Sequence, residues 1–205
     1  MNLLPKFFFD LSDFSWSDVF IEDSYVWESL KNINAFIDEK LRKQGENKLI
    51  LGEGSIIQDT ARIEGTAVIG KNCTIGHGAL LRGGVVIGDN VTIGHGAEVK
   101  HSIVLNSAAI AHLNYVGDSI VGSGVNISGG AILANWRFDK KNIKIHHENQ
   151  AIETGMEKCG GFIGDGSTIG VNAVLNPGTL LGRNSLVFPL VSVKGFHPEG
   201  SVIKS

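Results

Sequence analysis

The sequence predicts an all-β protein that folds as a parallel β-helix. Aliphatic residues recur at every sixth position over long stretches, and the residue after them is often glycine. The chain has 27 glycines and only 4 prolines, and glycine suits corners that need close backbone approach. Neither an α-helix nor a flat sheet has a six-residue period, whereas short strands joined by regular corners do. Each coil of such a solenoid covers the apolar side of the coil below.

One amphipathic helix is predicted before the repeats, over residues 23–44. Asp23 or Ser24 can cap its first turn, because a side-chain oxygen there accepts a bond from a free backbone N–H group. Its apolar stripe has helical spacing and consists of Val26, Leu30, Ile33, Ile37 and Leu41. With the aromatic segment before it, this helix is expected to form a cap over residues 1–48, since a solenoid needs its open end covered. The β-helix then occupies residues 49–205.

Two blocks of hexapeptide repeats follow. In the first block the six-residue positions are Ile57, Ile63, Ile69, Ile75, Leu81, Ile87, Ile93, Val99, Leu105 and Ala111. Small or β-branched residues four positions later, such as Cys73 and Ala109, are expected to share the interior. The second block repeats the rhythm from Ile163 to Val193. A loop excursion near 136–161 separates the two blocks.

The rhythm shortens after Ala111, with steps of five residues to Val116 and to Val121. One coil is therefore expected to be trimmed at two corners, with His112 at the first of them. Counting columns places Gly94 below this histidine and Ser128 above it, which leaves space beside the imidazole. A lone histidine is more often structural than catalytic, and a trimmed corner between small neighbours makes a functional role less rare without reversing that order.

These repeats resemble those of the hexapeptide-repeat acyltransferases. The resemblance implies a left-handed β-helix with about 18 residues per coil, and therefore about six to seven coils. The motif TIGHGA occurs at 74–79 and again at 92–97, so His77 and His95 should stack on successive coils, roughly 4.8 Å apart. Arg82 and Lys100 are also 18 residues apart, and two stacked cations suit a phosphate group. Both can equally be solvated surface residues.

A second resemblance is closer. Residues 112–135, HLNYVGDSIVGSGVNISGGAILAN, are similar to the acetyltransferase domain of the bifunctional enzymes that acetylate glucosamine 1-phosphate and then attach uridylate. The resemblance implies that His112 is the general base. It also implies an acceptor site with sugar-phosphate contacts from Arg82, Lys100, Tyr115 and Asn126. Asn135 takes the place of a residue that approaches both the acetyl donor and the amino sugar.

Residues 135–166 resemble the archaeal form of these enzymes, in which a longer basic excursion replaces a short loop. Lys141 and Lys144 match two lysines that help acetyl transfer there, although an ordinary solvated loop explains them equally well. The positions that the resemblance implies beside the coenzyme are Gly129, Asn135, Trp136 and Val171. The sequence departs from the family at three positions near the expected coenzyme site. Trp136 replaces a Tyr that is usual in bacterial members, Val171 replaces a common Ser, and Pro189 replaces a small residue.

The resulting hypothesis is acyl transfer from acetyl-CoA to the amine of a hexosamine 1-phosphate, without a covalent enzyme intermediate and without a metal. An ammonium group cannot attack a thioester, so a base must take its proton, and imidazole titrates near neutral pH. His112 has this role. Backbone N–H groups or Asn135 are expected to meet the developing oxyanion. The resemblance also implies a homotrimer with sites between its chains.

Composition argues against several other classes of protein. The formal net charge is -3 and the charged residues are spread out, which does not suit a nucleic-acid partner. The apolar start is broken by Lys6, Asp10 and Asp13, well short of a signal segment or membrane span. We therefore expect a cytoplasmic protein. Cys73 and Cys159 show no metal-ligand spacing and are expected to be structural thiols.

Two other functions stay open at this point. A γ-type carbonic anhydrase shares the predicted fold, and His77, His95 and His101 suggest a zinc site, although their spacing does not match its closely spaced ligand pair. A non-catalytic trimer that retains a sugar-nucleotide pocket is the second, and Val171 and Pro189 support it. For the acyltransferase itself, the acceptor can also be a nucleotide-linked amino sugar.

Overall fold

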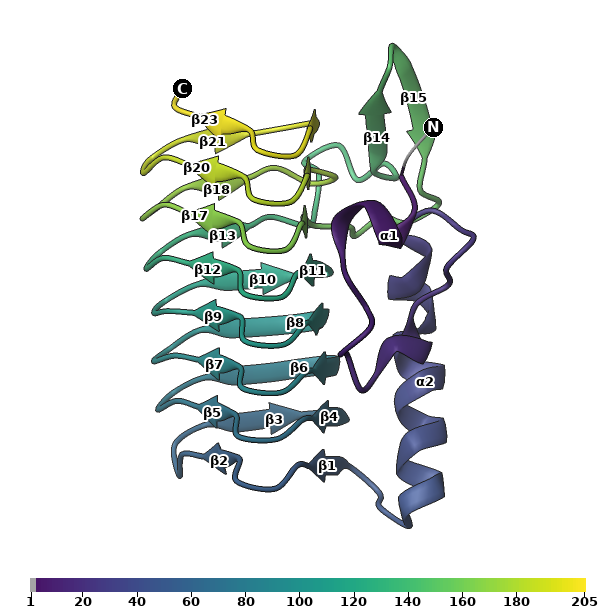
Figure 1. The fold of residues 1–205 in the computed structure, drawn as a ribbon, viewed down its shortest axis with the longest axis vertical. Coiled ribbons are helices and arrows are strands. Elements are labelled where there is room, and N and C mark those ends of the chain that lie inside the picture. Colours follow the sequence, from purple (N-terminus) through teal and green to yellow (C-terminus); the bar gives the residue numbers. More distant parts are fainter. Residues whose placement is uncertain (1–2) are drawn as a thin grey trace.

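The computed structural model describes residues 3–205 and contains the predicted β-helix (Figure 1). Short strands stack in register from coil to coil, and one long helix runs along the side of the stack. Among residues 3–205 the strand pairs between coils are parallel, and the one antiparallel pair is a hairpin outside the coils. The fold class is confirmed, while the hand of the coil stays a prediction from the resemblance.

The strands form three stacks, one on each side of the coil. The first stack contains β1 (Leu49–Leu51), β4 (Ala67–Ile69), the second halves of β6 (Leu80–Ile87) and β8 (Glu98–Val104), β11 (Ile120–Val121), β16 (Phe162–Ile163), β19 (Leu180–Leu181) and β22 (Phe196–His197). The second contains β2 (Ile56–Ile57), β5 (Thr74–Ile75), β7 (Thr92–Ile93), β9 (Ala109–Ile110), β12 (Asn126–Ile127), β17 (Thr168–Ile169), β20 (Leu186–Val187) and β23 (Val202–Ile203). The third contains β3 (Arg62–Glu64), the first halves of β6 and β8, β10 (Tyr115–Gly117), β13 (Ile132–Leu133), β18 (Val174–Leu175) and β21 (Ser192–Val193).

The stack is longer than we expected. Within the described residues the second stack has eight strands, one per coil, against the predicted six to seven coils. Its last coil is short, because Val187 pairs with Ile203 only 16 residues later. A count based on six-residue repeats therefore does not include this coil. The additional coil lengthens the stack but does not change the columns in which the candidate site residues lie.

The trimmed corners are not where the spacing placed them. β6 pairs with β8 at an interval of 18 residues up to Arg82, and at 17 from Val85 onward, so Ile87 lies beside Val104. One residue is therefore missing at the His101 corner, and a second is missing one coil above, at the Asp118 corner. Two neighbouring coils are each trimmed once at the same corner, rather than one coil twice.

This shift moves the interior positions by one residue. Val104, Ala108 and Ile110 face the coil interior, whereas the predicted set had Leu105, Ala109 and Ala111. Leu105 is also fully buried, but on the outside of the coil, beneath the N-terminal segment. An apolar pattern alone does not distinguish the two kinds of burial, which is why the prediction was wrong for this coil.

The shift also changes the neighbours of His112. The backbone N–H of Leu113 donates to the carbonyl of His95 at 2.9 Å, and the N–H of Gly130 donates to the carbonyl of His112 at 2.9 Å. His112 therefore stands above His95 and below Gly129. The predicted neighbours, Gly94 and Ser128, lie one position earlier along the corner.

The N-terminal region covers one side of the coils rather than the open end. It contains α1 (Pro5–Phe8), a 3-10 turn (Ser17–Val19) and α2 (Glu28–Gln44), so the helix begins later than predicted and has no side-chain cap at its start. Its stripe packs on the outer side of the first strand stack, against β4, β6 and β8. Trp16 donates from its indole to the carbonyl of Ile87 at 3.1 Å, which fastens the segment before α2 to the coil. Residues 1–2 of the predicted cap lie outside the described residues.

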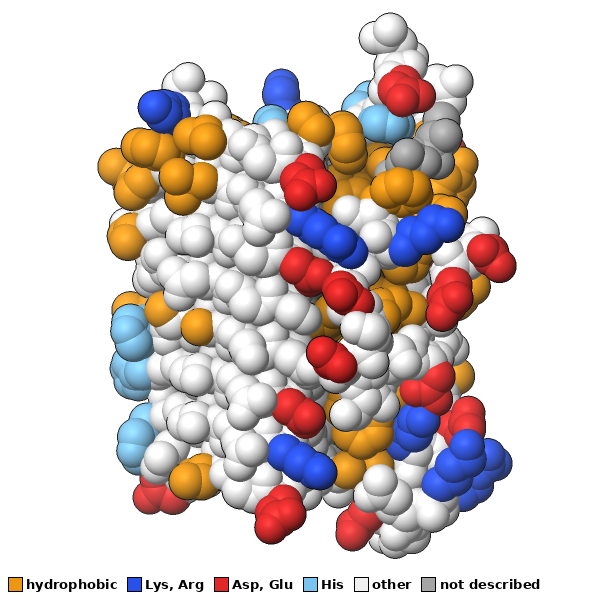
Figure 2. All heavy atoms as spheres, in the orientation of Figure 1, with side chains coloured by type: hydrophobic (Ala, Val, Ile, Leu, Met, Phe, Trp, Pro, Cys, Tyr) orange, Lys and Arg blue, Asp and Glu red, His pale blue; other side chains and the backbone are white. Residues whose placement is uncertain are grey.

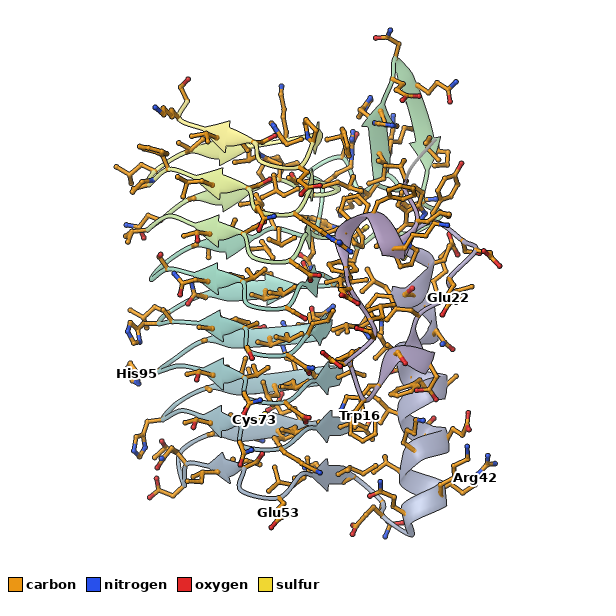
Figure 3. All side chains as sticks on the ribbon, in the orientation of Figure 1. Trp16, Glu22, Arg42, Glu53, Cys73 and His95 are labelled. Atoms are coloured by element: carbon orange, nitrogen blue, oxygen red, sulfur yellow. The ribbon has the colours of Figure 1, made fainter. Side chains whose placement is uncertain are left out.

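A hairpin accounts for the predicted excursion at 136–161. The chain leaves the coil after Asn135, forms β14 (Lys144–His147) and β15 (Gln150–Glu153), and rejoins the coil at Phe162. Both cysteines are free and buried: Cys73 lies inside the coil (Figure 3), and Cys159 lies where the excursion returns to it. No helix among residues 3–205 combines the length and apolarity that crossing a membrane would need.

Candidate active site

Three histidines lie one above the other at the corner between the second and third strand stacks. His77, His95 and His112, called the histidine column below, follow each other on successive coils, and His95 projects outward from its corner (Figure 3). The ring of His77 bonds to the Thr60 hydroxyl at 2.9 Å, and the ring of His95 bonds to the carbonyl of His77 at 2.9 Å. The exposed ring of His112 has no hydrogen-bond partner within residues 3–205. Both of its nitrogens are therefore open to a ligand.

Above His112 the same corner carries two positions that the family resemblance predicts to lie beside the coenzyme. The backbone N–H of Asn172 donates to the carbonyl of Gly129 at 3.0 Å, and the backbone N–H of Leu190 donates to the carbonyl of Val171 at 2.9 Å. This repeats the pattern seen around His112, so Gly129 and Val171 stand directly above it. Val171 is 48% exposed, and glycine adds no side chain at 129. The two positions directly above His112 therefore carry no charge and no polar side chain.

A second group of polar side chains lies along the third strand stack. Arg82 pairs with Lys100 in register, which confirms the predicted cation stack. Each cation, however, already has a carboxylate partner: Arg82 contacts Glu98 at 2.6 Å, and Lys100 contacts Asp118 at 2.7 Å. The stacked cations are therefore balanced by carboxylates of the same chain, and their contact with a phosphate stays a prediction.

Asp118 joins the cation stack to two further candidate residues. Its Oδ2 accepts a bond from the Asn135 amide at 2.5 Å, and the same amide nitrogen donates to the Tyr115 hydroxyl at 3.0 Å. Asp118 and Asn135 are both buried. Burial raises the pKa of Tyr115 above its usual value, and the nearby carboxylates of Asp118 and Glu98 add to this. The phenol is thus held as a neutral hydrogen-bonding group. The polar cluster, as we call it, consists of Arg82, Glu98, Lys100, Tyr115, Asp118 and Asn135.

His112 and Asp118 lie at the two corners that flank the third strand stack. They are six positions apart in the sequence, at most roughly 20 Å of extended chain, and Tyr115 of the polar cluster lies between them. No hydrogen bond or ion pair joins His112 to the cluster among the described residues. One chain therefore presents the predicted base and the predicted acceptor residues as two separate groups.

Three other predicted residues do not join the polar cluster. Asn126 is exposed on β12, in the second strand stack, between Ala109 and Thr168 of the neighbouring coils. Lys144 forms an ion pair with Glu153 across the hairpin at 2.7 Å, and Lys141 is exposed in the loop before it. Within one chain the ordinary solvated-loop interpretation therefore describes both lysines.

Trp136 is also separate from the histidine column. It follows Asn135 where the chain leaves the coil, is 42% exposed, and forms an isolated antiparallel bridge with Lys158. The predicted coenzyme residues thus divide into two pairs: Gly129 and Val171 stand above His112, while Asn135 and Trp136 lie at the other corner.

Glu98 and Asp118 are functional candidates that our sequence analysis missed. Asp118 ends the HLNYVGD motif and Glu98 precedes Lys100 by two residues, so a search for carboxylates beside the predicted cations finds both. Asn114 has a structural role instead. It is 3% exposed, and its amide donates to the carbonyl of Ser128 at 2.7 Å, so it fills the inside of the corner that carries His112.

The three histidines suggested for a zinc site do not come together at one point. His101 lies at the opposite corner from the histidine column, and its ring bonds to the carbonyl of Gly83 at 2.8 Å and to that of Leu30 at 3.1 Å. It therefore links the coil to α2. Among residues 3–205 no three His, Cys, Asp or Glu side chains come close enough together to hold a metal ion.

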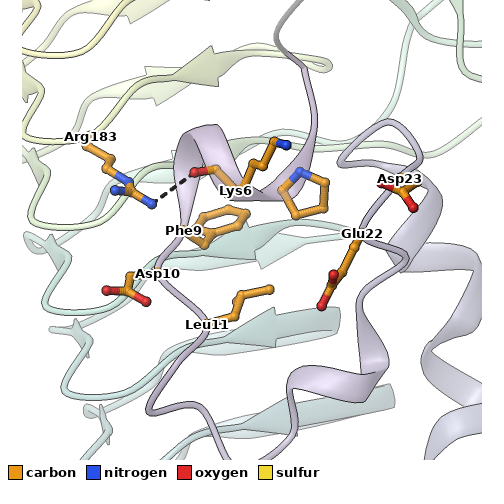
Figure 4. A pocket seen from close by; sticks show the side chains of 8 residues that line it. Lys6, Phe9, Asp10, Leu11, Glu22, Asp23 and Arg183 are labelled. Carbon is orange, nitrogen blue, oxygen red and sulfur yellow. Dashed lines mark hydrogen bonds between the residues drawn. The ribbon is translucent and has the colours of Figure 1, made fainter.

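A cavity of about 340 Å³ lies elsewhere, between the N-terminal segment and the loop after β19 (Figure 4). Arg183 borders it and donates to the carbonyl of Lys6 at 3.0 Å. None of the predicted site residues lines it. The candidate active site is instead an open surface on the outside of the coils.

Comparison with known proteins gives a family match over the same residues. A family model described as the GMPPB C-terminal domain matches residues 71–155, a range that contains His112 and the whole polar cluster. A model described as the hexapeptide repeat of succinyl-transferase matches residues 162–187. The predicted hexapeptide repeats are thereby confirmed in the second block, and the stacked strands of the first block agree with them.

Curated relatives agree with these matches. The bifunctional sugar-1-phosphate nucleotidylyltransferase/acetyltransferase of Sulfurisphaera tokodaii is 36% identical over 87 residues, which cover 42% of this chain and 22% of that protein. Bifunctional protein GlmU of Methanococcus maripaludis is 38% identical over 85 residues, which cover 42% of this chain and 20% of that protein. The match thus spans about a fifth of these relatives' length. The predicted resemblance to their acetyltransferase domain is confirmed.

The solved structures that the comparison returns are more distant in sequence than the curated relatives. The polysialic acid O-acetyltransferase OatWY has a TM-score of 0.49 and 17% identity, over 77% of this chain and 84% of that chain. A mutant of AntD, an N-acyltransferase from Bacillus cereus, has a TM-score of 0.49 and 18% identity, over 80% of this chain and 81% of that chain.

Proposed function

We propose that this chain, a hexapeptide-repeat β-helix that resembles the acetyltransferase domain of the bifunctional sugar-1-phosphate nucleotidylyltransferase/acetyltransferases, transfers an acetyl group from acetyl-CoA to the amine of a hexosamine 1-phosphate. The observation that carries this proposal is the open imidazole of His112. It stands at an outer corner, where neither ring nitrogen has a hydrogen-bond partner among residues 3–205, directly below the uncharged residues Gly129 and Val171.

His112 acts as the general base. Its ring takes a proton from the attacking ammonium, and the freed amine lone pair forms a C–N bond with the thioester carbonyl carbon. The C–S bond then breaks, and the CoA thiolate leaves and takes up a proton. The uncharged surface above the imidazole suits the thioester end of acetyl-CoA, because an acyl thioester carries no charge.

The polar cluster holds the acceptor sugar. Lys100 uses one of its three N–H donors on Asp118, and the Arg82 guanidinium has five donors of which Glu98 takes two. Both cations keep donors for a phosphate oxygen. Because the base and the polar cluster lie apart on one chain, a complete site combines His112 of one chain with the polar cluster of a neighbouring copy in a homotrimer.

A second acceptor is supported by the internal ion pairs. The phosphate of a sugar 1-phosphate carries close to two negative charges. In a nucleotide-linked sugar, the phosphate next to the sugar carries about one negative charge. Since Glu98 and Asp118 already balance the two cations, the less charged phosphate meets less repulsion. Acyl transfer to a nucleotide-linked amino sugar is therefore the alternative candidate.

One assay separates these acceptors. Release of free CoA is measured with acetyl-CoA and a panel of glucosamine 1-phosphate, galactosamine 1-phosphate, nucleotide-linked amino sugars and the unphosphorylated amino sugars. We expect turnover with a phosphorylated amino sugar and none with its N-acetylated form, which lacks the nucleophile. Turnover with none of the panel would contradict the proposed reaction and favour a non-catalytic binding protein.

A further inference from the structure

The buried carboxylate of Asp118 restricts how Asn135 can be oriented. A carboxylate only accepts hydrogen bonds, so the Asn135 side chain must turn its NH₂ group toward Oδ2 of Asp118, at 2.5 Å. A flipped amide would place its own oxygen against that carboxylate, two acceptors in contact. The orientation of this amide is therefore set by Asp118.

Both amide hydrogens of Asn135 are used inside the chain. One goes to Asp118 and the other to the Tyr115 hydroxyl at 3.0 Å. The amide oxygen Oδ1 accepts no bond within residues 3–205, and it is absent from the buried unpartnered atoms of that range, so solvent reaches it. Asn135 can therefore accept a hydrogen bond from a ligand, but it has no hydrogen left to donate.

The same network sets the direction of the other two groups. Tyr115 already accepts the Asn135 bond, so its O–H hydrogen is free to point at a ligand oxygen. Lys100, whose side chain is 15% exposed, gives one hydrogen to Asp118 and keeps two. Of these three residues, Asn135 thus offers an acceptor, Oδ1, while Tyr115 and Lys100 offer donors.

We infer that Asp118 is a positioning residue that sets the hydrogen-bonding direction of the acceptor site: Asn135 accepts, while Tyr115 and Lys100 donate. This inference rests on the proposed function. The ligand group that fits Oδ1 is an N–H or O–H of the amino sugar, and the groups that fit Tyr115 and Lys100 are hydroxyl or phosphate oxygens. Asn135 is thereby excluded as a donor to the developing oxyanion, which leaves backbone N–H groups for that role.

Asp118→Asn tests this role because an amide has the shape of the carboxylate but can both donate and accept. Asn135 is then free to flip, and a fraction of the molecules present NH₂ where the acceptor sugar needs an oxygen. We expect kcat/KM for the amino sugar to fall about ten- to hundredfold, the range for one lost hydrogen bond to a ligand, with KM for acetyl-CoA unchanged. Equal loss for both substrates, or no loss, would overturn the inference.

Asp165→Asn is the matched control. Asp165 is also a largely buried carboxylate that accepts bonds, from the backbone N–H groups of Asp10 and Ser123 at 2.7 Å each, but it lies beside the N-terminal segment. We expect this variant to keep both KM values. A kinetic change as large as that of Asp118→Asn would show that loss of any buried carboxylate has this effect, and would overturn a specific role for Asp118.

NMR of the wild-type protein tests the network without any turnover. The side-chain NH₂ hydrogens of Asn135 should exchange slowly with solvent, whereas those of the exposed Asn142 should exchange fast. Fast exchange at Asn135 would overturn the inference even if Asp118→Asn fails to fold. If no amino sugar is turned over but the Asn135 hydrogens are protected, the proposed reaction fails while the role of Asp118 is supported.

Discussion

His112 differs from the other members of the histidine column in its bonding rather than in its position. All three imidazoles lie at the same corner, but a hydroxyl or carbonyl occupies one nitrogen of His77 and of His95. A ring with two free nitrogens can take a proton at one nitrogen and bond a second ligand group with the other, whereas His95 has one nitrogen committed to the carbonyl of His77. Bonding at the level of single atoms thus supports the choice of His112 as the base.

Replacing this base should remove most of the activity. For His112→Gln we expect kcat to fall by about 10²- to 10⁴-fold with little change in KM, because general base catalysis contributes in that range. His95→Gln, one coil below, is the matched control and should keep wild-type turnover. CoA release with the best acceptor of the panel measures both. A His112→Gln enzyme that still works at the wild-type rate would contradict the proposed role.

Tyr115 allows a direct measurement inside the polar cluster. Burial, with Asp118 and Glu98 nearby, raises its pKa above the ordinary value of 10.0. The folded protein therefore holds this proton more tightly than the unfolded chain does. The associated stability is fully present below the unfolded value and is lost as the pH rises through the raised, folded value.

An absorbance titration of the phenolate tests this direction. The chain has 2 tyrosines, so the difference between the wild type and Tyr115→Phe isolates Tyr115. We expect a midpoint above pH 10 in the difference curve. A midpoint at or below that value would mean that the hydroxyl is solvated and that the cluster is not assembled as the structure has it.

The coil corner is the structural element that decides where the side chains point. Gly94 lies at the corner beneath the coil of His112, and an added Cβ there would sit 1.5 Å from the carbonyl oxygen of Ala111. The clash is with backbone, which cannot move aside without opening the stack. This glycine is thus required by close approach of two coils rather than by an unusual φ angle.

Gly94→Ala should therefore destabilise the fold by at least about 3 kcal/mol, as severe overpacking does. Gly124→Ala is the control: it has a φ of 65° but no atom within 4 Å of an added Cβ, so only the left-handed strain of about 1–2 kcal/mol applies. Urea unfolding followed by circular dichroism compares the two. Equal losses in the two variants would contradict the close contact between coils.

The element that sequence reasoning misplaced is the long helix. Its apolar stripe was predicted correctly, because burial on one face leaves a helical period in the sequence. The location of the helix was not predicted correctly, because an apolar stripe shows that one face is buried but does not identify the surface on which it packs. The partner surface along the side of the coils comes from strand residues that point out of the coil and are buried beneath the helix, including Val68, Val86 and Ile103.

At the scale of the whole molecule, one side of the solenoid is uncovered and carries few charges. The outward residues at the first position of the second strand stack are Ile56, Thr74, Thr92, Ala109, Asn126, Thr168, Leu186 and Val202. Figure 2 shows this side as mostly white, with orange near the C-terminal coils, pale blue histidines along one edge and most charged side chains further away. A flat, weakly charged side of this kind suits contact with another copy of the chain.

A homotrimer should therefore have a mass of about three times 21.9 kDa by light scattering. Thr92→Arg places a charge in the middle of this side, and we expect it to yield monomers that still fold. Asp38→Arg, on the exposed side of α2, is the control that should stay trimeric. A wild-type mass near 21.9 kDa at micromolar concentration would contradict the shared site.

Periodicity, motifs and residue type were enough to predict the repeat architecture, the amphipathic helix, the stacking of Arg82 on Lys100 and the family resemblance around His112. These are local properties of the chain, so they can be found without a structure. The folded coils were needed to show where the coil is shortened, which carboxylates neutralise the two cations, and which way Asn135 turns its amide. Those outcomes depend on register between coils, and a shift of one residue there exchanges inside for outside without changing the apolar pattern.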